Sequence, residues 1–380
     1  MADTLTPSRL RRLADLRPQR GRVLSVYLNL DPSELPTPRA RASAISSMIN
    51  DAQRRVDELS DLPHDDRMAL RADVEHVRDV LAQPDIADEG TRAIAVFACG
   101  PADLLETVRL AHPVEPRVVV DGSPYVEPLV RAGTGERWCA LLCNRRTARV
   151  FLGTPEALEE TDRVEDDVHS HHHQGGWSQA RYQRSVEEDV RDHLDHVAQV
   201  VFDVFKRQGL DHLLIGAPEE TLGDLESHLH PYLRERLAGR LHLDIEHSSL
   251  EEVRTETAKA VQEIERRRER EALDRFRQGV GAGGRAAAGI DDVLAALNEA
   301  RVGTLLLGAD FASSGYVDPA TGLLAGPDRS APVAGGALEA VDDIVERAIE
   351  KALESSAHVL VVRHHDDLAL HGGIGALLRY

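Results

Sequence analysis

The segment Val302-Gly303-Thr304-Leu305-Leu306-Leu307 decides the fold class, because it is a short apolar run enclosed by two helical patterns. The pattern before it covers residues 291–300. The pattern after it covers 338–353, where an apolar residue recurs every three or four positions, and it leads into a second apolar run, Val359-Leu360-Val361-Val362. Helices that alternate with short apolar strands are typical of a layered α/β sandwich. The sequence therefore predicts such a sandwich for the C-terminal segment.

Outward from this segment, the N-terminal third of the chain shows the same class of pattern. Residues 21–30 and 92–100 are apolar runs with strand character, and the residues between them carry helical patterns at about 39–62 and 65–81. These elements predict a first α/β domain over residues 1–133.

The middle segment, residues 134–278, begins with a hairpin pattern in which two apolar runs are joined through a turn at Asn144-Arg145. An acidic connector and a polar loop follow, and then two helical stretches separated by a further strand. The predicted elements are the strands 138–143 and 148–152, the polar loop 169–183, and the helices 186–207 and about 250–276. The sequence predicts a middle domain with these boundaries.

The run Gly279-Val280-Gly281-Ala282-Gly283-Gly284 is interpreted as a flexible boundary between the middle and C-terminal domains. The same letters match G-x-G-x-x-G, which binds dinucleotides when a strand precedes it and a helix follows. A long helical pattern precedes it here, so a linker is favoured over a cofactor loop, and no cofactor is predicted. The expected organisation is three domains, the last of which covers residues 285–380.

Composition and charge narrow the classes of protein. The chain has 380 residues, 42% of them hydrophobic and 29% charged, which is ordinary for a globular protein. The net charge of −20 disfavours a general nucleic-acid coat, so an RNA contact would need a local patch. Three cysteines cannot form a disulfide framework, and no apolar run approaches the ~18 residues of a membrane span. A reduced, cytoplasmic protein without a membrane segment is expected.

The loop that precedes the helix at 186–207 is the strongest candidate for contact with an anionic partner. Residues 169–185 contain no acidic side chain in a chain that is otherwise strongly acidic. Gly175 and Gly176 remove side-chain bulk, which lets backbone enter a narrow space. The amide of Gln179 offers both a donor and an acceptor, enough to orient a water molecule. The alternative interpretation is a solvated, mobile loop.

Other motifs carry weaker signals. Four histidines of the loop, His169 and His171 to His173, could hold a metal, but no second ligand cluster has suitable spacing and no metal is predicted. The glycines at the C-terminus are interpreted as a closing strand that packs closely against the last domain. The arginine run 266–270 is interpreted as a solvated helix face with pairs at i,i+4, with RNA contact as the alternative.

Taken together, the order of domains and two motifs resemble the archaeal and eukaryotic class I peptide chain release factors and Pelota. The loop Gly175-Gly176-Trp177-Ser178-Gln179-Ala180-Arg181-Tyr182-Gln183-Arg184 is similar to the Gly-Gly-Gln segment of those factors. The ending Gly372-Gly373-Ile374-Gly375-Ala376-Leu377-Leu378-Arg379-Tyr380 is similar to their closing strand. The resemblance, which extends to bacterial and especially actinobacterial relatives, implies an RNase H-like middle domain. It also implies an α/β/α sandwich like that of kink-turn-binding ribosomal proteins at the C-terminus.

The resemblance implies a site in which the loop enters the peptidyl-transferase centre of the large ribosomal subunit. Gly175 and Gly176 match the two glycines, while Trp177 stands in the glutamine position and cannot accept a hydrogen bond as an amide does. Gln179 is expected to take over the orientation of the hydrolytic water, because Vms-type peptidyl-tRNA hydrolases also carry a displaced glutamine. Arg181 and Arg184 are expected to bind RNA phosphate, with Trp177 as a further RNA contact.

The resemblance leaves three functional hypotheses. The first is hydrolysis of peptidyl-tRNA on stalled ribosomes, for which a translational GTPase is a candidate delivery partner. Stop-codon reading is not expected, because residues 1–133 contain no lysine and therefore no Asn-Ile-Lys-Ser element. The second is a non-catalytic ribosome hibernation factor that occupies the A site, since Trp177 could stack on an RNA base. The third is a stress-related protein that has the fold without a ribosomal role.

Overall fold

The computed structural model describes residues 5–60, 62–84, 86, 90–133, 135–155, 157–166, 179–281, 284–328 and 338–379, with the backbone alone for 179–185. The chain forms two compact units. Unit 1 comprises Met1–Gly135 and Arg266–Tyr380, and unit 2 comprises Glu136–Glu265. Two of the three predicted domains therefore fall in unit 1, and the division into three domains stays a prediction. Within the described ranges no helix is both long enough and apolar enough to span a bilayer.

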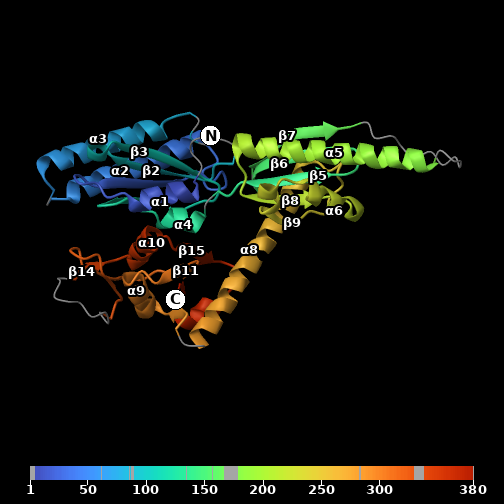
Figure 1. Ribbon diagram of the computed structural model, residues 1–380. Helices are drawn as coiled ribbons and strands as arrows, with labels where there is room; N and C mark the ends of the chain where they lie inside the picture. The colour runs from blue at the N-terminus through green and yellow to red at the C-terminus, as the bar shows by residue number, and fades with distance from the viewer. Residues whose placement is uncertain are drawn as a thin grey trace. The chain divides into compact units, whose positions relative to one another are not determined.

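The N-terminal part of unit 1 is an antiparallel sheet in the order β3-β2-β1-β4, with helices on both faces (Figure 1). Its strands are β1 (Val23–Asn29), β2 (Ala93–Cys99), β3 (Leu104–Leu110) and β4 (Arg117–Asp121), and its helices are α1 (Pro7–Asp15), α2 (Pro38–Glu58), α3 (His64–Leu81), the 3-10 turn η1 (Gly100–Ala102) and α4 (Glu127–Ala132). Alternate residues of β1 face opposite layers. Leu24 and Val26 pack with α2 and α3, while Tyr27 packs in the core that contains α1 and α4.

The C-terminal part of unit 1 is an α/β/α sandwich. Its main sheet has the order β10-β16-β11-β15, in which β11 and β15 are parallel. Its elements are β10 (Ala286–Ala288), α9 (Ile290–Asn298), β11 (Val302–Gly308), α10 (Ile344–Glu354), β15 (His358–Val362), the 3-10 turn η2 (Asp367–His371) and β16 (Ile374–Leu378); a small sheet contains β12 (Gly315–Val317), β13 (Leu324–Ala325) and β14 (Glu339–Val341). Leu305 and Leu307 pack with α9 and α10, and Leu306 packs against Phe276 on the opposite face.

The two parts of unit 1 share one hydrophobic core and a buried polar contact. The carboxylate of Glu346 in α10 accepts hydrogen bonds from the backbone N–H groups of Val126, at 2.7 Å, and Glu127, at 2.6 Å. These are donors at the start of α4, which has no side-chain cap of its own. Burial, followed by the charge of Glu350, raises the pKa of Glu346 well above its ordinary value. Arg347 adds an ion pair with Asp121.

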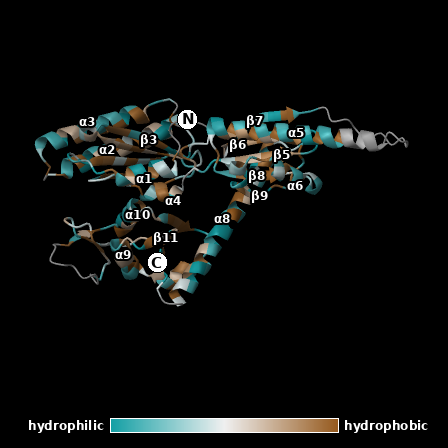
Figure 2. Cartoon of the chain, in the orientation of Figure 1, coloured by the Kyte–Doolittle hydropathy of each residue, from teal (hydrophilic) through white to brown (hydrophobic). Residues whose placement is uncertain are grey.

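Unit 2 is a five-stranded mixed sheet in the order β7-β6-β5-β8-β9, where β5, β8 and β9 run parallel. Its strands are β5 (Trp138–Cys143), β6 (Thr147–Thr154), β7 (Ala157–Glu165), β8 (His212–Gly216) and β9 (Leu237–Arg240), and its helices are α5 (Gln179–Gln208), α6 (Glu219–His228), α7 (Pro231–Arg234) and α8 (Leu250–Gly281), whose last residues belong to unit 1. Core residues of α5 and α6 cover one face, and those of α8 cover the other. Figure 2 shows alternating brown and teal along α5, as expected for a helix with one buried face.

Three predicted element boundaries are wrong. Residues 179–183, predicted as loop, belong to α5, because the sequence from Gln179 onward contains no proline or glycine that would stop a helix. Residues 279–281, predicted as linker, are the last turn of α8, where a Cβ on Gly279 would lie only 2.8 Å from the Cβ of Ala286. The last helical pattern begins at Ile344 instead of 338, because Asp343 caps the N–H groups of Val345 and Glu346.

Candidate functional site

The predicted site residues fall at the connection between β7 and α5. Gly175, Gly176 and Trp177 lie outside the described residues. Gln179 is the first residue of α5, and Arg181 and Arg184 belong to its first two turns, with only the backbone described. The structure therefore places Gln179 on a helix, where sequence patterns predicted a loop, and leaves its interactions with the glycines untested.

The base of this connection is held by a carboxylate and two histidines. Asp166 directly follows β7, and its backbone N–H donates to the carbonyl of Arg146 at 3.0 Å. The Asp166 carboxylate lies 2.6 Å from Nδ1 of His193, whose side chain is fully buried, and 3.2 Å from Nδ1 of His196. Partial burial opposes ionisation, but the hydrogen bonds to His193 and His196 lower the pKa of Asp166 below its ordinary value. We name this group the Asp166 clamp.

The start of α5 lies well beyond the Asp166 clamp. Fourteen residues separate Gln179 from His193, and a helix rises about 1.5 Å per residue, which gives about 21 Å of helix before the clamp. Among the described side chains of α5, Val186 is already buried, and Val190 is the first that packs against the core between α5 and the sheet. Figure 1 shows the start of α5 continuing past the strands of unit 2. Gln179 thus lies at the far end of the helix from the clamp.

The start of α5 concentrates positive charge. Its first turn contains no acidic residue, and the N-terminus of a helix carries the positive end of the helix dipole. Arg181 and Arg184 add two full charges, and the first acidic residue of the helix is Glu187. Backbone N–H donors at the start of a helix can bind an anion such as a phosphate group.

The described residues offer little support for other chemistries. Outside the gaps given above, no three His, Cys, Asp or Glu side chains lie together as metal ligands, and His169 and His171 to His173 fall in one of those gaps. The three cysteines are free and buried, and burial raises the pKa of both Cys139 and Cys143 to about 12. Such thiols are poor nucleophiles at neutral pH.

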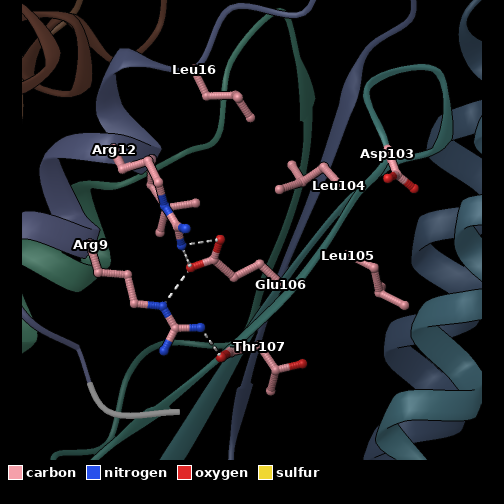
Figure 3. Close-up of a pocket in the computed structure, with 9 residues that line it drawn as sticks. Arg9, Arg12, Leu16, Asp103, Leu104, Leu105, Glu106 and Thr107 are labelled. Atoms are coloured by element: carbon pink, nitrogen blue, oxygen red, sulfur yellow. Dashed lines mark hydrogen bonds and ion pairs between the residues drawn. The ribbon is translucent and has the colours of Figure 1, made fainter. Parts of the chain in front are cut away.

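One pocket lies in unit 1, between α1 and β3, and has a volume of about 540 Å³ (Figure 3). Its two arginines already have a partner: Arg9 Nε lies 2.5 Å and Arg12 Nη2 lies 2.7 Å from the carboxylate of Glu106. Arg9 also donates to the carbonyl of Thr107 at 2.6 Å. Because β3 is an edge strand, these contacts tie α1 to an otherwise open sheet edge. We therefore interpret the arginines of the pocket as residues that hold α1 against β3.

Sequence patterns missed the Asp166 clamp. Its histidines lie three residues apart on one helix face, and this spacing can be found in the sequence. The acid partner cannot be found in this way, because it is 27 residues away from His193. The arginine run 266–270 also has a role that the pattern did not indicate. Its only acid, Glu269, is buried and accepts hydrogen bonds from the N–H groups of Arg363 and His364.

Comparison with known proteins gives the same relationship that the loop and the C-terminal motif predict. Residues 124–278 match the family model of bacterial archaeo-eukaryotic release factor family 10. Peptide chain release factor subunit 1 of Archaeoglobus fulgidus is 28% identical over 197 residues. This match covers 50% of the chain and 48% of the relative, so it spans about half the length of that protein.

Two solved structures are similar over longer stretches. The crystal structure of an archaeal translation termination factor aligns with 99% of this chain and 99% of its own, at 18% identity and a TM-score of 0.27. A ribosome-bound archaeal Pelota, in a model that also contains ABCE1, aligns with 76% and 77%, at 18% identity and a TM-score of 0.41. Through the family match over residues 124–278 and the Archaeoglobus sequence, this chain is similar to the archaeo-eukaryotic peptide chain release factors.

Proposed function

We propose that this protein is a ribosome-associated translation factor that hydrolyses peptidyl-tRNA on stalled ribosomes. The observation that carries the proposal is the start of α5, which is positively charged and extends about 21 Å beyond the Asp166 clamp. Gly175 and Gly176 stand four and three positions before Gln179 in the sequence. The relationship to release factors supports a ribosomal partner, because those proteins act in translation.

In this proposal water is the nucleophile and the protein positions it. The water oxygen attacks the ester carbonyl carbon, the bond from that carbon to the tRNA ribose oxygen breaks, and a proton passes to the ribose oxygen. The products are a peptide with a free carboxylate and a deacylated tRNA. Gln179 holds the water through its amide, and Arg181 and Arg184 bind RNA phosphate. Placement of the reacting groups supplies most of the rate.

The test compares release of peptide from ribosome-bound peptidyl-tRNA by the wild-type protein and by Gln179→Ala. We expect the substitution to lower the rate about 100-fold, the effect of losing one positioned hydrogen-bonding group. Gln199→Ala is the matched control, because Gln199 is an exposed glutamine of the same helix whose side chain donates only to Asp203, at 3.1 Å. Equal rates for Gln179→Ala and wild type would exclude Gln179 from the reaction.

A second candidate function follows from Trp177, which stands where the release factors carry glutamine. As a non-catalytic hibernation factor, the protein would occupy the A site of idle ribosomes and use the indole to stack on an RNA base. Wild-type protein would then co-sediment with vacant ribosomes and release no peptide, and Trp177→Ala would weaken the co-sedimentation. Absence of co-sedimentation at low salt would contradict both functions.

A further inference from the structure

Unit 2 carries a row of aromatic rings at the C-terminal end of α5, remote in sequence from the predicted site. Phe202 stacks on His230 with a centroid distance of 4.1 Å and an interplanar angle of 16°, and on Phe205 at 6.1 Å and 25°. His230 in turn contacts Tyr232 at 4.9 Å and 52°. We call these four residues the aromatic row. Only 4% of the chain is aromatic, so three such residues and a histidine in one row form an unusual local concentration.

Cationic side chains flank the aromatic row. Lys206 Nζ lies 4.8 Å from the centroid of the Phe202 ring, and the guanidinium of Arg236 lies 4.8 Å from that of Phe205. Lys206 also pairs with Asp203 at 2.7 Å. Arg234 and Arg236 form no ion pair within the described residues, although Glu235 lies between them in the chain. Arg236 donates to the backbone carbonyls of Leu210, at 3.1 Å, and Tyr232, at 2.7 Å, whereas Arg234 is exposed and is therefore the arginine available to an external anion.

The outer end of the row is open to solvent. Tyr232 is 54% exposed, and within the described residues of unit 2 no other large apolar side chain is comparably exposed. Protein-binding surfaces normally surround such an aromatic anchor with further apolar area. A single exposed ring beside arginines is instead typical of surfaces that stack an unpaired base and contact its phosphate.

We propose that Tyr232 stacks on an unpaired base of RNA and that Arg234 binds the adjacent phosphate. The surface is a second RNA contact of unit 2, separate in the sequence from the start of α5. The inference depends on the proposed function only for the source of the RNA, which would be the ribosome or its tRNA. Binding itself requires only the aromatic row and its cations.

The local backbone does not depend on the Tyr232 side chain. The Tyr232 N–H donates to Nδ1 of His230 at 3.3 Å, and the Tyr232 carbonyl accepts from Arg236 at 2.7 Å. Both contacts use backbone atoms of Tyr232 and survive its truncation. Tyr232→Ala should therefore remove the exposed ring while α7 stays in place, which makes it a clean probe of stacking.

The experiment measures binding of the full chain to a labelled single-stranded RNA of about ten nucleotides by fluorescence anisotropy, over a range of salt concentrations. We expect Tyr232→Ala to raise Kd about 5- to 150-fold without changing the slope of log Kd against log salt, because stacking releases no counterion. Tyr232→Phe should bind as wild type does. Arg234→Gln should lower the slope by about 0.7, the value for one phosphate contact on a single strand.

Two controls identify the kind of partner. Leu370→Ala removes an apolar side chain that is 90% exposed in unit 1, and it should leave Kd unchanged. A duplex RNA of the same sequence should bind wild type and Tyr232→Ala equally, because its bases are already stacked. Equal affinity of wild type and Tyr232→Ala for the single strand would overturn the inference, and so would weak binding by Tyr232→Phe. The assay contains no ribosome and no ester, so failure of peptidyl-tRNA hydrolysis would not alter its outcome.

Discussion

Substitution of Gly375 by alanine tests how closely the last strand packs against α8. Gly375 lies in the middle of β16, paired with Leu306 of β11 and Ala288 of β10. A Cβ at this position would lie 2.6 Å from Cε2 and 2.8 Å from Cζ of Phe276, and 3.3 Å from a methyl group of Leu368. Phe276 is 1% exposed, so its ring has no free space into which it could move. The added methyl group must displace packed atoms.

We expect Gly375→Ala to lower the free energy of unfolding of unit 1 by about 1–3 kcal/mol, the usual cost of an extra methyl group in a filled core. Phe276→Leu should restore part of this loss, because it removes the ring atoms that the new Cβ would touch. The pair should then show a favourable coupling of about 0.5–3 kcal/mol in a double-mutant cycle. Gly223→Ala is the matched control, since a Cβ there meets no atom within 4 Å.

The assay is urea unfolding followed by far-UV circular dichroism, with hydrogen exchange of peptides from β11 and β16 to assign the change to unit 1. Trp138 is buried in unit 2, and in a Trp177→Phe background its fluorescence provides an internal reference whose unfolding midpoint should be the same in all variants. Additive effects of Gly375→Ala and Phe276→Leu, within about 0.5 kcal/mol, would refute the close packing of Gly375 on the Phe276 ring.

Three further outcomes follow from the geometry of unit 2. Gly153→Ala should destabilise unit 2 by about 3 kcal/mol or more in urea unfolding. The φ angle of Gly153 is +155°, and a Cβ there would lie 2.1 Å from the carbonyl oxygen of Ala157. An unfolding midpoint equal to that of wild type would contradict this expectation. The lowered pKa of Asp166 means that its carboxylate stabilises unit 2 above its ordinary pKa of 3.8 and that this contribution disappears as pH falls through the lowered value. Asp166→Asn should therefore be less stable than wild type near pH ~6, and the difference should narrow as the pH falls below 3.8. Cys139 and Cys143, with pKa values of about 12 caused by burial, should react with Ellman's reagent at about pH 8 only after unfolding; rapid labelling of the native protein would show that they are exposed.

Local patterns were sufficient for much of the fold. The apolar runs at 302–307 and 359–362 became β11 and β15, and the hairpin pattern at 138–152 became β5 and β6. The predicted ends of helices were less accurate where a single side chain determines the residue at which the helix begins. The cap by Asp343 starts α10 six residues after the apolar periodicity begins, because a capping hydrogen bond depends on one residue and leaves no periodic signal.

What the sequence by itself determined is the α/β class, the relationship to release factors and the absence of acidic residues before α5, because each is a property of neighbouring residues. Tertiary structure alone decided which distant groups meet. Glu346 caps α4 from 220 residues away, Asp166 joins His193 across the β7–α5 connection, and Phe202 stacks on His230. Such contacts depend on how strands and helices are ordered in the sheets, and no local spacing of residues encodes that order.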